Sequence, residues 1–100
     1  MKTAYLAISS KHKTIGQVNL ELSEACQYLE KKGYKVIYYH LAREEFKIKH
    51  TKHSSVWHLG KKIQALSLCD IAVFLGDDKF LEKRIAIHYN IPCFTNLNDI

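Results

Sequence analysis

Short β-prone apolar runs alternate with longer amphipathic stretches along this chain, and this alternation constrains the fold more than any other feature. In each amphipathic stretch, apolar residues recur every three or four positions, which is the spacing of a helix with one buried face. The runs are bounded by Gly, Pro, Asn or charged residues, which is typical of strands. The expected strands are Thr3–Ile8, Lys35–His40, Asp70–Leu75 and Ile91–Thr95, and the expected helices are Gln17–Lys32, Ser54 or Ser55 to Leu68, and Phe80–Tyr89.

Strands that alternate with helices form parallel sheets, because each helix carries the chain back across the sheet. The sequence therefore predicts one domain over residues 1–100 with an α/β fold: a three-layer, flavodoxin-like or Rossmann-like open sheet of about four parallel strands in the order 2-1-3-4. Asp70–Leu75 is apolar on both faces and is expected at the centre. Gly33 and Asn90 are expected to close the first and last helices in the left-handed conformation.

The remaining segments are expected to be irregular or short. The tail from Asn96 to Ile100 is too short for a further unit, Leu41–Phe46 could form a short helix, and Lys47–His53 is expected to be a charged loop.

Helical spacing also predicts which side chains face the core. The inward positions are expected at Val18, Leu22, Ala25, Cys26 and Leu29 in the first helix, at Val56, Leu59, Ile63 and Leu66 with Trp57 in the second, and at Leu81, Ile85, Ala86 and Tyr89 in the third.

Composition excludes several classes of protein. Fifteen Lys and Arg against ten Asp and Glu give a net charge of +5, which is modest for a nucleic-acid binder and fits a lysine-rich surface. No apolar run approaches the ~20 residues of a membrane span, and no secretory signal is recognisable, so a cytoplasmic protein is expected. Cys26, Cys69 and Cys93 are expected to be reduced, buried thiols. An exposed sheet edge would allow a homodimer.

Ligands of such sheets bind beyond the carboxyl ends of the strands, where the chain crosses to opposite sides. That point lies between the loop Ser9 to Ile15 and the loop Gly76 to Lys79. Ser9, Ser10, Lys11 and His12 could bind an anion or a sugar hydroxyl there; alternatively, they form a solvated loop with a serine cap. Neither glycine-rich nucleotide fingerprint occurs, which disfavours standard dinucleotide and P-loop binding.

Carboxylates follow the central strand. Asp77, Asp78 and Glu82 could supply a nucleophile and an acid or base, although Asp before a helix and Glu in its first turn also suit capping. No metal site and no cofactor are expected, because the pair His50 and His53 has no further ligand at a customary spacing. The lysines from Lys47 to Lys62, near Trp57, form the alternative candidate, a basic face for nucleic acid or an acidic protein.

Several segments together resemble the nucleoside 2-deoxyribosyltransferase-like superfamily over roughly residues 3 to 95, with a weaker likeness to TIR-like domains. The segments that carry the resemblance are Tyr5-Leu6-Ala7, Gly33-Tyr34-Lys35-Val36, Cys69-Asp70-Ile71-Ala72-Val73, and Glu82 with Ala86, Asn90 and Ile91-Pro92-Cys93-Phe94.

The resemblance implies a nucleoside, nucleotide or related ribosyl ligand. In the superfamily, the glutamate that corresponds to Glu82 attacks the anomeric carbon, and here Asp77 or Asp78 would be the acid. The ligand-binding residues would be Tyr5, Ser9, Ser10, Lys11 and Gly76. The sequence departs from the superfamily where Ile8-Ser9-Ser10 replaces a Gly-Pro, where the usual Gly-Thr or Ser-Arg-Gly before Glu82 is missing, and where Lys62 replaces an aspartate. Binding with or without cleavage of an N-glycosidic bond is expected, and a non-enzymatic interaction module is the alternative.

Overall fold

A computed structural model describes residues 1–9, 11–38, 54–76 and 80–100. Its four parallel strands lie in the order β2-β1-β3-β4, which confirms the predicted topology. The central pair, β1 and β3, aligns Ala4 with Ile71 and Ile8 with Leu75. The strands are β1 (Lys2–Ile8), β2 (Tyr34–Ile37), β3 (Ile71–Leu75) and β4 (Cys93–Phe94).

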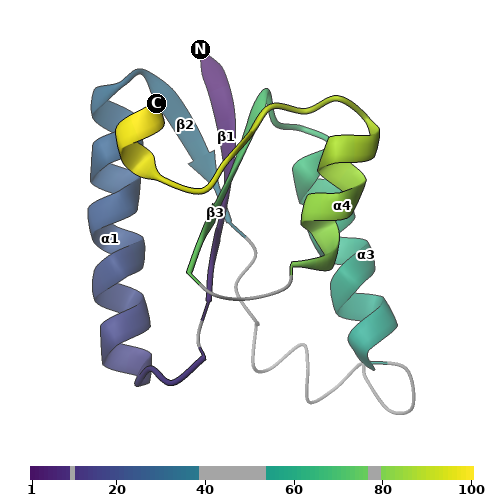
Figure 1. The fold of residues 1–100 in the computed structure, drawn as a ribbon, viewed down its shortest axis with the longest axis horizontal. Coiled ribbons are helices and arrows are strands. Elements are labelled where there is room, and N and C mark those ends of the chain that lie inside the picture. Colours follow the sequence, from purple (N-terminus) through teal and green to yellow (C-terminus); the bar gives the residue numbers. More distant parts are fainter. Residues whose placement is uncertain (10, 39–53, 77–79) are drawn as a thin grey trace.

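Helices cover both faces of the sheet and form the outer two of three layers (Figure 1). Helix α1 (Ile15–Lys31) packs on one face, where its Ala25 and Leu29 meet Leu6 and Val73 of the strands. Helices α3 (Ser54–Leu66) and α4 (Leu81–His88) lie on the other face. There Leu66 and Ala86 pack with Tyr5, Ala72 and Phe74. Alternate residues of β1 and β3 thus serve opposite cores, as the pleat of a strand requires.

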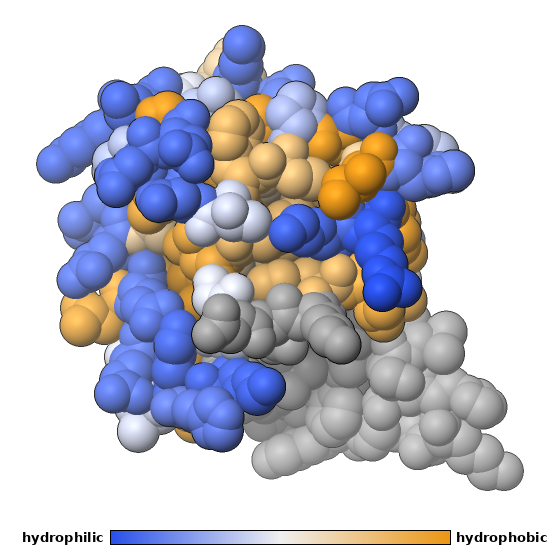
Figure 2. Space-filling model, in the orientation of Figure 1, coloured by the Kyte–Doolittle hydropathy of each residue, from blue (hydrophilic) through white to orange (hydrophobic). Residues whose placement is uncertain are grey.

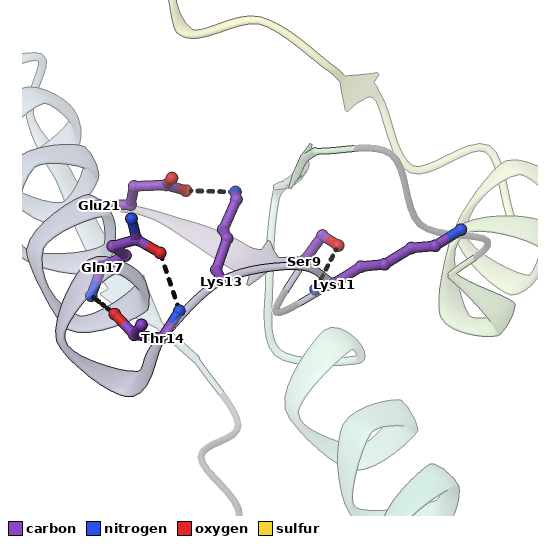
Figure 3. Close-up of polar contacts among 6 residues, drawn as sticks. All are labelled: Ser9, Lys11, Lys13, Thr14, Gln17 and Glu21. Carbon is purple, nitrogen blue, oxygen red and sulfur yellow. Dashed lines mark hydrogen bonds and ion pairs between the residues drawn. The ribbon is translucent and has the colours of Figure 1, made fainter.

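Helix α1 begins at Ile15, two residues earlier than the apolar spacing predicted, because Thr14 caps it. The Thr14 hydroxyl accepts a hydrogen bond from the Gln17 amide (3.1 Å), and the Thr14 amide donates to the Gln17 side chain (2.8 Å) (Figure 3). This reciprocal pair is a capping box. The loop after β1 therefore ends at Thr14 and is shorter than expected.

The predicted helix closures are confirmed: Gly33 has φ = 90° and Asn90 has φ = 60°. Strands β2 and β4 are shorter than their apolar runs. Pro92 lies outside β4, and its carbonyl accepts a hydrogen bond from the Ala72 amide (2.9 Å). The tail, predicted to form no further unit, makes one 3-10 turn, η1 (Leu97–Asp99), whose Leu97 packs beside α1's core cluster.

The predicted inward face of α4 is wrong at two positions. Leu81 and Tyr89 are 58% and 71% exposed, whereas Glu82 and Ala86 are buried. Glu82 can occupy the inward position because a tyrosine and a lysine on neighbouring elements satisfy its carboxylate. The buried face of α4 is therefore centred on Glu82 and Ala86, and Leu81 and Tyr89 lie outside it.

Cys26, Cys69 and Cys93 are free, as expected, but half-buried rather than buried. Within the described part of the chain, no helix is long and apolar enough to cross a membrane. The expectations for the short helix Leu41–Phe46, the charged loop Lys47–His53 and the side chains of Val56 and Trp57 fall outside the described residues.

Candidate functional site

The loops after β1 and β3 meet at the carboxyl edge of the sheet. The Ser9 amide donates to the carbonyl of Leu75 (2.8 Å), which extends the β1–β3 pairing past the strands. Gly76 turns the chain with φ = 104°, and a Cβ at this position would lie 2.6 Å from the Ser9 Cβ. Only glycine satisfies both the conformation and the space, so Gly76 allows the two loops to touch.

An open pocket of about 540 Å³ lies at this junction, and Ser9, Lys11, His12, Lys13 and Gly76 line it. Ser9 is buried, and its hydroxyl accepts a hydrogen bond from the Lys11 amide (3.2 Å). The pocket lies between the crossovers to opposite sides of the sheet, the position where open α/β sheets bind ligands. The structure thus brings together three of the residues that the sequence indicated as ligand-binding: Ser9, Lys11 and Gly76.

The two lysines of the pocket point in different directions. Lys13 turns back over α1 and pairs with Glu21 (2.9 Å), whereas the Lys11 side chain extends the other way, toward the side of the sheet that carries α4 (Figure 3). Between them, His12 has φ = 61°, a left-handed conformation uncommon for residues other than glycine. This turn separates the two ammonium groups, so only one of them is held by the Glu21 carboxylate.

Glu82 forms a second polar cluster, on the face of the sheet that α3 and α4 cover. Its Oε2 accepts a hydrogen bond from the Tyr5 hydroxyl (3.0 Å) and lies 3.7 Å from the Lys62 Nζ. Glu82 is 2% exposed and Tyr5 is 1% exposed, whereas the Lys62 side chain is 38% exposed. Glu82 also lies in the first turn of α4, where the helix dipole favours a carboxylate. Three elements therefore hold this buried acid in one position.

Burial raises the pKa of Tyr5, and the neighbouring Glu82 carboxylate raises it further. The phenol therefore remains protonated at neutral pH and acts as a hydrogen-bond donor to Glu82. Burial, together with the charge of Asp70, also raises the pKa of Cys69 to about 11. Cys69 is accordingly a thiol at neutral pH.

The predicted site residues thus fall into two groups. Ser9, Lys11 and Gly76 line the pocket, whereas Tyr5 and Glu82 contact each other between the sheet and α4 and are not among its described lining residues. Ser10, Asp77 and Asp78 lie outside the described residues. Among the described residues, no three His, Cys, Asp or Glu side chains are grouped as metal ligands. The pair His50 and His53 is not described.

Sequence reasoning indicated His12, which lines the pocket, but missed Lys13 and one contact of Glu82. Lys13 lines the pocket although it was given no role, and its adjacency to Lys11 was the available signal. Lys62 was singled out as a departure from the superfamily and as part of the basic face, yet the structure places it against Glu82. No local pattern signals that contact, because twenty residues and an intervening strand separate the two.

The chain was compared with protein-family models, curated proteins and solved structures, and none of them matches it.

Proposed function

We propose that this protein binds a nucleoside, nucleotide or related ribosyl ligand at the carboxyl ends of β1 and β3. The observation that carries the proposal is the pocket of about 540 Å³ at the junction of the two loops, whose lining includes a serine, a histidine and two lysines. These groups suit a polyhydroxylated or anionic ligand rather than an apolar one. The resemblance to the nucleoside 2-deoxyribosyltransferase-like superfamily supports the ribosyl class of ligand.

Cleavage or transfer of an N-glycosidic bond is the chemistry proposed for such a ligand. Glu82 would attack the anomeric carbon, and Asp77 or Asp78 would protonate the leaving base. In the described structure the Glu82 carboxylate is buried and already contacts Tyr5 and Lys62, so the attack requires that it become accessible. Binding is therefore the part of the proposal that the geometry supports best.

Thermal shift against nucleosides, nucleotides, cyclic nucleotides, nicotinamide dinucleotide and ADP-ribose tests the binding. A ligand present at 100 times its dissociation constant stabilises the folded state by about 2.7 kcal/mol, which raises the Tm of a domain of this size by roughly 10 °C. We expect at least one member of the panel to give such a shift. The wild-type protein incubated with that ligand is then analysed by chromatography for released base, with Glu82→Gln as the variant that should release none.

Lys11→Ala should reduce the shift, because Lys11 lines the pocket and its exposed side chain can be removed without disturbing the core. The matched control is Lys31→Ala, in the last turn of α1 at the opposite end of that helix. A panel that produces no shift, or a shift that Lys11→Ala leaves unchanged, would contradict ligand binding in this pocket and would favour the interaction module.

A further inference from the structure

We propose that the ligand carries a phosphate group and that Lys11 binds it, so that the protein distinguishes nucleotides from nucleosides. This inference rests on the proposed function and adds to it the chemical class that the pocket selects. It is argued from the charges of the described residues around the pocket.

Two lysines line the pocket, Lys11 and Lys13, and Lys13 is already paired with Glu21. Within the described ranges, no carboxylate lies at ion-pair distance from the Lys11 ammonium, whose side chain extends away from Glu21 (Figure 3). Lys11 is therefore the cation positioned to meet an anionic group of the ligand, and a phosphate is the anionic group of a nucleotide.

The backbone that follows the pocket also favours an anion. Helix α1 begins at Ile15, two residues after Lys13, and its first turn contains no acidic residue. The positive end of a helix of this length adds to the field of the lysines and is not cancelled by a carboxylate in that turn. Figure 2 shows hydrophilic side chains gathered over the start of α1 and the loop before it, at the lower left.

Two described acids on neighbouring elements are each paired with a lysine. Glu21 is neutralised by Lys13, and Glu82 is neutralised by Lys62 and bonded to Tyr5. Neither leaves an unpaired negative charge to repel a phosphate. Asp77 and Asp78 lie outside the described residues and are not counted among these acids.

Isothermal titration calorimetry with matched ligands tests the inference. The probes are the four ribonucleosides and their 5′-monophosphates and 5′-diphosphates, titrated into wild-type protein, Lys11→Ala and Lys31→Ala. We expect a phosphorylated ligand to bind about tenfold or more tightly than its own nucleoside, because a hydrogen bond to a charged group is worth that much. Lys11→Ala should remove most of this preference by weakening the phosphorylated ligand more than its nucleoside, and Lys31→Ala should keep the preference.

The outcomes separate this inference from the proposed function. Equal affinity for nucleoside and nucleotide, or a preference that survives in Lys11→Ala although both ligands bind that variant more weakly, would overturn the phosphate assignment and leave ribosyl binding in the pocket intact. Failure of every probe to bind would overturn both. Tight binding of a single-stranded oligonucleotide without binding of any mononucleotide would assign the lysine to a nucleic-acid backbone and would also overturn the inference.

Discussion

Glu82→Ala is expected to lower the free energy of unfolding by about 2–4 kcal/mol. The substitution removes the acceptor of the Tyr5 hydroxyl, which is 1% exposed and has no access to water in its place. It also removes the counter-charge of Lys62, at a smaller cost because the Lys62 side chain is 38% exposed and can be hydrated. Chemical denaturation with a constant m-value measures the loss.

Two conservative variants show which interaction of Glu82 accounts for the expected loss of stability. Glu82→Gln keeps an oxygen that accepts from Tyr5 and should cost about 1 kcal/mol, whereas Tyr5→Phe removes the donor alone and should cost about 1–2 kcal/mol. Because the two residues share one hydrogen bond, the losses of Tyr5→Phe and Glu82→Ala should not add. Additive losses, or a Glu82→Ala protein as stable as the wild type, would show that the hydrogen bond between Tyr5 and Glu82 contributes nothing to stability.

Gly76→Ala is expected to destabilise the protein by about 2–4 kcal/mol and to close the pocket partly. At φ = 104° an alanine is strained, and its Cβ would lie 2.6 Å from the Ser9 Cβ, so the loop after β1 must move. That movement would break or lengthen the hydrogen bond from the Ser9 amide to Leu75. Denaturation measures the loss of stability, and the thermal shift of the bound ligand should fall in the same variant.

Gly60→Ala is the matched control for that prediction. Gly60 lies within α3, and an added Cβ would meet no atom within 4 Å. Alanine stabilises a helix interior by roughly 0.5–1 kcal/mol relative to glycine, so this variant should be more stable than the wild type. A Gly76→Ala protein that matched Gly60→Ala in stability would refute the close approach of the two loops.

Much of the fold could be predicted because strands and helix ends depend on residues that are close together in the sequence. The apolar run Ile71–Leu75 is buried on both faces only at the centre of a sheet, and β3 lies there. Gly33 and Asn90 close helices because their own backbones tolerate positive φ. The start of α1 was missed although its signal was present, since Thr14 and Gln17 have the spacing of a capping box.

The inward face of α4 could not be predicted in the same way. Apolar periodicity assigns a glutamate to the surface, and it assigned Leu81 and Tyr89 to the core. Glu82 is buried instead because Tyr5, which is distant in sequence, points its hydroxyl at the same place. Such a contact depends on how β1, α3 and α4 pack together, and no single segment encodes it.

The candidate site was predictable to the extent that topology places it. Parallel strands end at one edge, so Ser9 and Gly76 had to be near each other once the order 2-1-3-4 was known. That Tyr5 and Glu82 contact each other and are not among the described lining residues of the pocket was not predictable, because it depends on how α3 and α4 pack against the sheet.

Amide chemical-shift mapping would show whether the ribosyl ligand binds where β1 and β3 end. The ligand identified by thermal shift is titrated into ¹⁵N-labelled protein while backbone amide shifts are recorded. We expect the largest, saturable changes at Ser9, Lys11, His12 and Gly76, and little change at the apolar groove between α3 and α4 around Ile63, Ile85 and Tyr89. Changes centred on that groove, with the amides of Ser9 and Gly76 unaffected, would contradict this expectation.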